Sequence, residues 1–358
     1  MKYPEVLGFD ALLPQLGAFD AIIDARSEAE YALDHIPGAI NCPVLNDEER
    51  IRVGTLYKQT GAFEAKKVGA PIIAHNIARH IDTLWADKPR EWRPLVYCWR
   101  GGNRSGAMAH ILARIGWPVV QLDGGYKSYR AHVSAALENP PTLDLRVVCG
   151  TTGSGKSRLL ETLDGIGAQV LDLEKLAAHR GSVLGHLPNE PQPSQKMFES
   201  LVWDTLRRFD PDKPVFVESE SKKVGNLRVP GLVMERMRAA PCIAVNLSRP
   251  NRVRLLMEDY EHFCADPSAL KTQLDHLVQL HGRARIDAWH AMADGGEMTE
   301  LVDQLLAAHY DPAYLRSIDR NFVRYPQAEV LELDDIAPKD FMAAARKLVG
   351  LAATPPTR

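Results

Sequence analysis

The sequence predicts an α/β protein with two domains, each built on a parallel sheet. Its 358 residues are enough for two domains of ordinary size. Short apolar strands alternate with amphipathic helices over residues 1–138, and this alternation is typical of a parallel sheet covered by helices. Two prolines then interrupt the pattern before a new apolar strand begins. We therefore expect a first domain at residues 1–138, a linker at 139–144, a second α/β domain with a helical C-terminal part at 145–350, and a frayed tail at 351–358.

The spacing of apolar residues predicts the individual elements. In the first domain the expected strands are residues 19–25, 94–98 and 119–122, and the expected helices are residues 48–85 with a break near Gly61, 103–115 and 126–137. In the second domain the expected strands are residues 145–149, 169–171, 215–217, 241–247 and 330–333. The expected later helices are residues 274–290, 298–309 and 339–349, with a turn at 309–314.

The stretch YCWRGGNRS at residues 97–105 carries the first candidate site. Cys98 stands where an apolar strand ends and a glycine-rich loop leads into a helix N-terminus. Unpaired backbone N–H groups and the cations Arg100 and Arg104 would favour a thiolate and a bound oxyanion there, whereas the alternative is an inert core cysteine. We expect Cys98 and Arg104 to be catalytic, in an anion-binding loop formed by Trp99, Arg100, Gly101, Gly102, Asn103 and Ser105.

A second candidate site lies at residues 150–157. The sequence GTTGSGKS matches the full G-x-x-x-x-G-K-S phosphate-binding loop, between an apolar strand and a helix. Glycines let the backbone N–H groups face a polyphosphate, Lys156 would reach its outer phosphate, and the Ser157 hydroxyl is a candidate ligand for Mg²⁺. The expected phosphate-binding residues are Gly150, Gly153, Ser154, Gly155, Lys156 and Ser157.

The acids that follow this loop bear on what it binds. A nucleotide hydrolase needs a metal-directing acid at the end of a second strand, and Asp172 and Glu218 are the candidates. Neither stands in a long apolar strand with a neighbouring catalytic acid. We therefore expect a diphosphate or triphosphate ligand rather than ATP hydrolysis, with no metal assigned beyond Mg²⁺ at Ser157.

Several polar residues outside the two loops are candidate substrate contacts, with a solvated surface as the alternative. They are Lys127, Arg180, Gln192, Ser194, Gln195, Glu218, Ser219 and Lys222. A further group of basic residues, including Arg249, Arg252 and Arg254, could form an RNA-facing surface, although arginines scattered on helices usually only solubilise.

The overall composition excludes little. The chain has 43 Lys and Arg against 46 Asp and Glu, a net charge of −3 that neither requires nor forbids a nucleic-acid partner. Five cysteines form no CxxC pair and no even framework, so we expect a reducing compartment. The sequence shows no signal-peptide pattern and no membrane-length apolar run, so we expect a cytoplasmic protein without a membrane partner.

The first domain resembles the rhodanese domains, which carry sulfur as a persulfide on a loop cysteine. The resemblance rests on the loop closed by Arg104-Ser105 and on two upstream segments, residues 24–31 (DARSEAEY) and 35–41 (HIPGAIN). It implies that Asp24 and Arg26 belong to the scaffold beneath the loop. One feature departs from the pattern, because Arg104 is six positions after Cys98 rather than five. This spacing is similar to that of the related cell-cycle phosphatases and suits a phosphate-sized or selenium-bearing group.

A rhodanese-like domain fused to a P-loop domain resembles the tRNA 2-selenouridine synthase family over essentially the whole chain. Four further segments fit that family: residues 124–127 (GGYK), 192–195 (QPSQ), 218–221 (ESES) and 310–312 (YDP). The resemblance implies an enzyme, a selenotransferase and geranyltransferase, that replaces sulfur by selenium at the 2-position of a wobble 2-thiouridine in tRNA.

The resemblance also implies the co-substrates and partners. Selenophosphate is the selenium donor, geranyl diphosphate first alkylates the sulfur, and an enzyme that produces selenophosphate is a further partner. No tightly bound cofactor is expected. Three alternatives stay open: a rhodanese-type sulfurtransferase, a phosphatase, and a binding module switched by a nucleotide at the P-loop.

Overall fold

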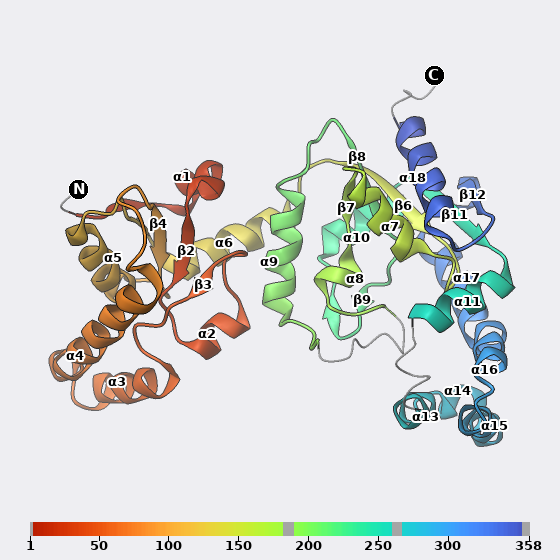
Figure 1. The fold of residues 1–358 in the computed structure, drawn as a ribbon, viewed down its shortest axis with the longest axis horizontal. Helices are drawn as coiled ribbons and strands as arrows, with labels where there is room; N and C mark the ends of the chain where they lie inside the picture. Colours follow the sequence, from red (N-terminus) through yellow and green to blue (C-terminus); the bar gives the residue numbers. More distant parts are fainter. Residues whose placement is uncertain (1–2, 182–189, 260–266, 353–358) are drawn as a thin grey trace. The chain divides into compact units, whose positions relative to one another are not determined.

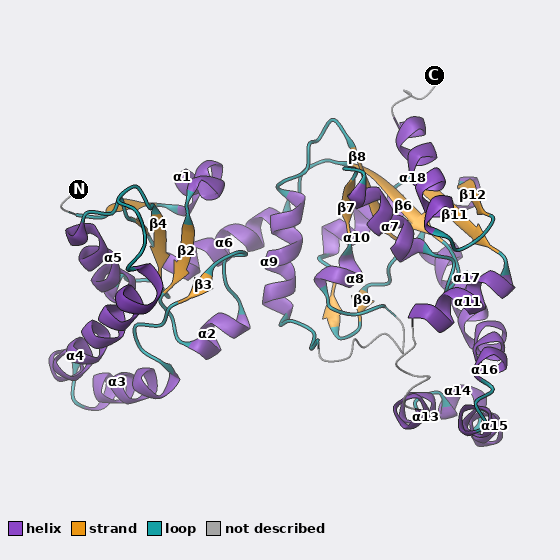
Figure 2. Ribbon diagram, viewed as in Figure 1, coloured by secondary structure: helices purple, strands orange, loops and turns teal. Residues whose placement is uncertain are grey.

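The computed structural model describes residues 3–181, 190–259 and 267–352, and the chain folds into two compact units (Figure 1). Unit 1 comprises Met1–Asn139 and Pro193–Asp204, and unit 2 comprises Pro140–Gln192 and Thr205–Arg358. Each unit has its own five-stranded parallel sheet surrounded by helices (Figure 2). The predicted fold class is therefore confirmed. The predicted domain bounds stay a prediction, and packing places one segment, Pro193–Asp204, with unit 1.

Unit 1 is organised around a sheet with the order β1-β5-β4-β2-β3, in which all neighbours are parallel. Its strands are β1 (Glu5–Leu7), β2 (Ala21–Asp24), β3 (Ile40–Asn41), β4 (Pro94–Tyr97) and β5 (Val120–Leu122). Its helices are α1 (Phe9–Leu12), η1 (Leu13–Ala18), α2 (Glu28–Leu33), α3 (Asp47–Gln59), α4 (Ala62–His80), η2 (Ile81–Trp85), α5 (Asn103–Ile115) and α6 (Gly125–Glu138).

The central strand β4 fixes the position of the first candidate loop. All four residues of β4 are buried, because helices cover both faces of the sheet. Its neighbours β2 and β5 run parallel to it, so the loops that follow β4 and β5 leave the same edge. This confirms the prediction that Cys98 and residues 123–127 share one edge of the sheet.

The helix α9 (Gln195–Leu206) comes late in the chain, yet residues 193–204 pack in unit 1. Trp203 is buried and its ring lies 5.9 Å from Phe9, 5.7 Å from Tyr129 and 5.7 Å from His132, measured between ring centroids. The Ser200 hydroxyl donates to the buried Asp34 carboxylate at 2.8 Å. Helix α9 thus contributes to the core of unit 1, whose other elements all lie before residue 140.

Unit 2 contains a sheet with the order β12-β11-β6-β8-β7, which places β6 at its centre. Its strands are β6 (Asp144–Cys149), β7 (Gln169–Leu171), β8 (Pro214–Glu218), β11 (Cys242–Leu247) and β12 (Glu329–Leu333), with a separate hairpin of β9 (Lys223–Val224) and β10 (Leu227–Arg228). The helices around this sheet are α7 (Lys156–Gly165), α8 (Leu173–Leu176), α10 (Gly231–Ala239), α11 (Arg249–Asp259), η4 (Tyr325–Gln327) and α18 (Pro338–Ala352).

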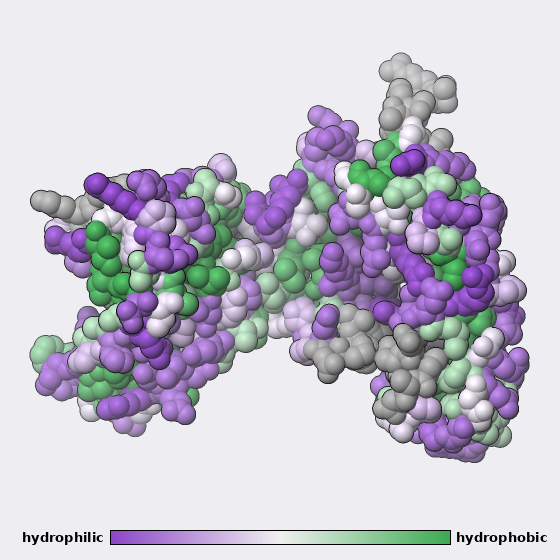
Figure 3. Space-filling model, in the orientation of Figure 1, coloured by the Kyte–Doolittle hydropathy of each residue, from purple (hydrophilic) through white to green (hydrophobic). Residues whose placement is uncertain are grey.

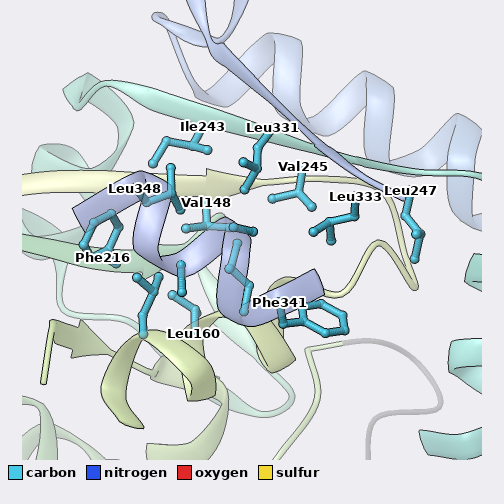
Figure 4. Close-up of a cluster of buried hydrophobic side chains, with 14 of the residues drawn as sticks. Val148, Leu160, Phe216, Ile243, Val245, Leu247, Leu331, Leu333, Phe341 and Leu348 are labelled. Carbon is cyan, nitrogen blue, oxygen red and sulfur yellow. The ribbon is translucent and has the colours of Figure 1, made fainter. Parts of the chain in front are cut away.

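One apolar cluster holds α7 and α18 on the sheet of unit 2. Figure 4 shows Leu160 of α7 and Phe341 of α18 among the side chains of the strands, including Val148 and Val245. Each fully buried side chain of this size contributes roughly 1.5–3 kcal/mol. Because α7 begins where the second candidate loop ends, this packing also fixes the loop.

The C-terminal part of unit 2 is helical, as expected, but two details of the prediction are wrong. Residues 274–290 do not form one helix. They are divided among α13 (Pro267–Asp275), α14 (Val278–His281) and α15 (Arg283–Asp294). Helix α14 ends where the Gly282 N–H donates to the Val278 carbonyl. Residues 309–314 are not a turn, because α16 (Met298–Leu305) continues through η3 (Leu306–Tyr310) into α17 (Asp311–Asn321). Pro312, which has no N–H to donate, directly follows the π-helical segment η3 within this continuous helix.

The ends and surface of the chain add little to the site. Helix α18 runs to Ala352, and residues 353–358 of the predicted frayed tail lie outside the described residues. Hydrophilic and hydrophobic residues are mixed on the face that Figure 3 shows. Over the described ranges, no helix has both the length and the apolar character needed to cross a membrane.

Replacing Trp203 with alanine should loosen unit 1. Truncating a buried aromatic side chain to alanine lowers the free energy of unfolding by about 3–5 kcal/mol. We expect faster amide hydrogen exchange in α6, which carries Tyr129 and His132, measured by mass spectrometry on the intact chain. Lys196→Ala, an exposed position of the same helix, is the matched control and should leave the exchange unchanged. Equal exchange in the two variants would show that α9 does not support unit 1.

Candidate functional site

Cys98 lies directly after β4, at the bottom of a loop that leads into α5. Its side chain is only 3% exposed, and its sulfur accepts a hydrogen bond from the Ser105 hydroxyl at 3.2 Å. The Gln121 amide donates in turn to that hydroxyl at 3.4 Å. Ser105 belongs to the first turn of α5, so the sulfur and the helix N-terminus meet as the sequence predicted.

The loop also offers backbone donors. In this fully described part of the chain, the N–H groups of residues 99–101 and 103–105 donate to no protein acceptor, whereas those of Gly102 and Gly106 do. Donors of this kind at a helix N-terminus suit an anion. The arrangement can therefore hold a phosphate or a developing oxyanion beside the Cys98 sulfur.

Residues 124–127 dock on this loop through their backbone. The Tyr126 N–H donates to the Cys98 carbonyl at 2.7 Å, and the Lys127 N–H donates to the Trp99 carbonyl at 3.1 Å. Gly125 has φ +57°, and a Cβ there would lie 2.3 Å from the Cys98 oxygen, so only glycine allows this approach. The GGYK segment thus sets the conformation of the cysteine loop.

Aromatic stacking continues this contact to the surface. The Trp99 and Tyr126 rings stack with centroids 5.3 Å apart, and the Lys127 ammonium lies 6.0 Å from the Trp99 ring. Trp99 is 37% exposed, which is unusual for so large an apolar side chain. An exposed aromatic face beside a cation can stack against a nucleobase.

Arg104 is held by an acid from α2. Its guanidinium forms two hydrogen bonds with the Glu30 carboxylate, at 2.6 and 3.0 Å, and both side chains are mostly buried. Burial by itself raises the pKa of Glu30, but the hydrogen bonds and charge of Arg104 outweigh it, so the pKa of Glu30 is lowered. Glu30 was not among the predicted site residues, although it lies in the DARSEAEY segment.

The scaffold beneath the loop contains a buried ion pair. Arg26 and Asp24 are 1% and 0% exposed and lie 2.6 Å apart. The Arg26 guanidinium also lies 4.1 Å from the centre of the Tyr126 ring. His35 stacks on Tyr31 and contacts its carbonyl at 2.9 Å, so it has a structural role in α2.

The second loop follows β6 and ends at α7, in the predicted strand-loop-helix context. The Lys156 ammonium folds back on the loop and donates to the Gly150 carbonyl at 2.8 Å. It also lies 3.6 Å from Glu218, which ends the adjacent strand β8. Within the described ranges, the buried Ser154 hydroxyl has no hydrogen-bond partner. A loop of this kind is preorganised to receive phosphate oxygens.

Three glutamates converge beside this loop. One ligand oxygen from each of Glu174, Glu218 and Glu220 lies within 4.8 Å of the other two. The expectation that Glu218 has no neighbouring catalytic acid stays a prediction, but two other carboxylates, those of Glu220 and Glu174, lie beside it in the folded chain. The other predicted acid, Asp172, instead caps α8 by accepting the Lys175 N–H at 2.8 Å.

Burial and mutual repulsion perturb these carboxyls strongly. Burial, followed by the charges of Glu218 and Glu220, raises the pKa of Glu174 well above its ordinary value. Burial and the charge of Glu218 raise the pKa of Glu220 to about 8. Burial likewise raises the pKa of Glu218, although Lys156 opposes that shift. Clustered carboxyls with such pKa values are typical of functional sites.

Residues from α11 and α17 hold the P-loop from outside. The Tyr314 hydroxyl accepts the Gly150 N–H at 2.6 Å, and it lies 3.2 Å from the Ser219 hydroxyl. Arg252 donates to the Thr152 carbonyl at 2.9 Å and forms a bidentate pair with Asp311. The assignment of Arg252 to an RNA-facing surface is wrong, because the side chain is only 6% exposed.

The remaining predicted contacts are divided between the units. Ser194 donates to the Leu33 carbonyl, and the Gln195 amide donates to Glu199, so both belong to unit 1. In unit 2, Gln192 joins two loops by donating to the Ala177 and Val224 carbonyls. Arg180 donates to the Asp259 carbonyl, and Lys222 is exposed. Their role as substrate contacts stays a prediction.

Comparisons with known proteins match both units. Residues 9–132 match the family model of the rhodanese-like domain, and residues 143–281 match that of the tRNA 2-selenouridine synthase AAA domain. Curated relatives carry the name tRNA 2-selenouridine synthase. One from Sulfurovum is 30% identical over 87% of this chain and 94% of its own length.

Two further relatives carry the same name. A protein of Bdellovibrio bacteriovorus is 32% identical over 84% of this chain and 90% of its own length. A protein of Nitrosomonas europaea is 35% identical over 73% of this chain and 68% of its own length.

The Glu30–Arg104 pair should make stability depend on pH in a defined direction. Because the pKa of Glu30 is lowered on folding, its contribution is complete above the ordinary value of 4.5 and is lost as the pH falls through the lower folded value. We expect Glu30→Gln to lower the Tm at neutral pH, with the difference from wild type narrowing below about pH 4.5.

Thermal unfolding across that pH range measures the effect. Glu64→Gln removes a surface ion pair with Lys67 and is the control, since exposed pairs contribute little. A Glu30→Gln difference that is constant at every pH would mean that the carboxylate charge does not act through Arg104.

Proposed function

Because this chain belongs to the tRNA 2-selenouridine synthase family, we propose that it replaces the sulfur of a wobble 2-thiouridine in tRNA with selenium. The observation that carries the proposal is the presence of two different anion-binding loops in one chain. One has a nucleophilic atom, Cys98, at its base, and the other has the cation Lys156. A reaction that needs two phosphorylated donors, selenophosphate and geranyl diphosphate, would use both.

The first step assigned to the P-loop is alkylation of the tRNA. The sulfur of 2-thiouridine attacks C1 of geranyl diphosphate, the carbon–oxygen bond breaks, and diphosphate leaves while the base loses a proton. The loop amides and Lys156 would stabilise the charge on the departing diphosphate. The position of Lys156 supports this assignment. Its ammonium lies at the loop, where it contacts the Gly150 carbonyl, the Glu218 carboxylate and the Tyr314 ring.

The second step is assigned to unit 1. S-alkylation makes the sulfur a better leaving group, and a selenium nucleophile then displaces it as geranyl thiol. Selenophosphate supplies that nucleophile: its selenium attacks C2 of the base, geranyl thiol leaves with a proton, and water then cleaves the phosphorus–selenium bond and releases phosphate. Cys98 would hold the selenium beside the base without a change of oxidation state, and the amides of residues 99–101 and 103–105 would receive the phosphate of the donor. Arg104 would bind that phosphate while its guanidinium also stays paired with Glu30.

Nucleoside mass spectrometry tests the reaction and its order. Transfer RNA carrying 2-thiouridine is incubated with the protein and with geranyl diphosphate, selenophosphate, or both. We expect a geranylated nucleoside with the first donor and selenouridine with both. Unchanged nucleosides, together with release of phosphate from an aryl phosphate or retention of a nucleotide, would instead favour a phosphatase or a nucleotide-switched binding module.

Substitution of Cys98 should separate the two steps. Cys98→Ser should lower the rate of selenium incorporation at least 100-fold and leave the rate of geranylation unchanged, because the Cys98 sulfur lies in unit 1 and the P-loop in unit 2. Cys42→Ser is the matched control, since Cys42 is also buried in unit 1 and burial raises the pKa of its thiol to about 12. Selenouridine formation by Cys98→Ser at the wild-type rate would exclude Cys98 as the carrier.

Substitution of Lys156 should have the opposite effect. Lys156→Ala should abolish geranylation because the diphosphate loses its cation, yet selenation of tRNA that is already geranylated should continue. Lys213→Ala, on the surface of the same unit, is the control. If Lys156→Ala reduces both steps equally, geranyl diphosphate does not bind at the P-loop.

A further inference from the structure

The helical hairpin of α3 and α4 in unit 1 has no role in the reaction as described so far. The two helices lie side by side (Figure 1). Gly69 of α4 is buried, and a Cβ there would lie 3.3 Å from Val53 of α3, so a missing side chain lets the helices approach. The Asn76 amide also donates to the Glu49 carboxylate at 2.8 Å. The hairpin is therefore a defined part of unit 1 and not a loose connection.

Helix α3 and the start of α4 expose large apolar side chains. None of the 13 residues of α3, all of which the structure describes, is buried. Ile51 and Tyr57 are 59% and 58% exposed, and Phe63, in the first turn of α4, is 72% exposed. A helix in a folded domain normally buries an apolar face, so exposed apolar side chains gathered on one hairpin mark an interaction surface.

The charge of the hairpin indicates the kind of partner. We call residues 52–67, where α3 ends and α4 begins, the hairpin tip. The tip has four cations and one acid, a net charge of +3 in a chain whose total charge is −3. These residues are Arg52, Lys58, Lys66, Lys67 and Glu64. A local excess of positive charge of this kind attracts a polyanion.

Most of these cations can bind an anion. Lys67 pairs with Glu64 at 3.2 Å on the surface, where such a pair contributes little. The exposed side chains of Arg52, Lys58 and Lys66 form no ion pair within the described chain. The exposed rings of the tip lie close to these cations in sequence. Cations for phosphates together with rings that stack on bases are the combination that binds single-stranded RNA.

The hairpin begins beside the cysteine loop. Nε of Arg50 lies 3.8 Å from the Glu30 carboxylate, which also pairs with Arg104 at 2.6 Å. From Arg50 to the end of α3 near Lys58, the helix advances by roughly 12 Å. An RNA strand with one base at the cysteine loop can therefore continue along α3 to the hairpin tip.

We propose that the hairpin tip binds the single-stranded part of an RNA, with Arg52, Lys58 and Lys66 on its phosphates and Tyr57 stacked on an unpaired base. That this RNA is a tRNA rests on the proposed function, and the loop that holds a wobble base supplies such unpaired bases. The RNA-binding surface itself rests on the exposure and charge of the hairpin. It is tested by binding alone, without selenophosphate or geranyl diphosphate.

Binding of a fluorescently labelled tRNA transcript to the intact chain, followed by anisotropy over a series of salt concentrations, tests the cations. Lys58→Ala/Lys66→Ala should weaken binding at least fivefold at about 0.1 M salt. The slope of log K against log salt should become shallower by roughly 1.5, because two phosphate contacts are lost. Arg90→Ala/Arg114→Ala is the matched control and should bind as wild type does. It also removes two exposed cations, but before β4 and at the end of α5, where the strands of the sheet begin.

The stacking side chain has a different signature in the same assay. Tyr57→Ala should weaken binding at least threefold and leave the salt slope unchanged, because the ring carries no charge. Leu84→Ala, at a 47% exposed apolar position outside the hairpin tip, is the control and should have no effect.

A measurement on wild type alone covers the case in which a variant loses stability. Surface lysines are acetylated with an N-hydroxysuccinimide ester, with and without the tRNA transcript, and the modified peptides are measured by mass spectrometry. The tRNA should slow acetylation of Lys58 and Lys66 at least threefold and leave that of Lys88, outside the hairpin, unchanged.

Equal affinity and equal salt slope for wild type and Lys58→Ala/Lys66→Ala would overturn the inference, and so would equal acetylation of these lysines with and without tRNA. The hairpin would then be left as a surface for a protein. Neither result concerns the chemistry, because no donor is present. Failure of the proposed function would instead appear as unchanged nucleosides with wild type and both donors.

Discussion

The buried carboxylate of Asp34 is the contact on which the first site depends. It accepts the Tyr126 hydroxyl at 2.7 Å and the Ser200 hydroxyl at 2.8 Å, and Arg130 lies 3.7 Å away. Tyr126 in turn binds the Cys98 carbonyl through its N–H and stacks on the loop through its ring. A single carboxylate therefore joins α9, α6 and the cysteine loop. Because it is fully buried, losing any of its donors would leave an unsatisfied charge.

The second site depends on a balance of charge rather than on one contact. Lys156 neutralises part of the glutamate cluster and also binds the loop carbonyl of Gly150, so the loop and the acids share one cation. Asp311 and Tyr314, both from α17, hold the loop from the other side through Arg252 and the Gly150 N–H. Helix α17 thus fixes the conformation of the phosphate loop, although the two are more than 150 residues apart in sequence. This explains why the helical part belongs to the same unit as the sheet.

The sequence was sufficient to predict the strands and loops that form the two candidate sites. Apolar spacing located β4, β6, β8 and β11, and the strand-loop-helix contexts placed Cys98 and Lys156 at the ends of strands. The parallel-sheet rule predicted that residues 123–127 lie beside the cysteine loop. What local pattern could not supply was packing across long separations. The docking of α9 in unit 1 and the pairing of Glu30 with Arg104 join residues that no short motif connects.

The glutamate cluster illustrates why such features escape sequence analysis. The sequence places Glu218 at the end of an apolar strand, but nothing near Glu174 or Glu220 in sequence indicates that they join it. Only the adjacency of β6 and β8 brings Glu218 beside the P-loop, and only the position of α8 adds Glu174. A chain that buries these charges next to a phosphate-binding loop accepts a stability cost that hydrophobic side chains would have avoided.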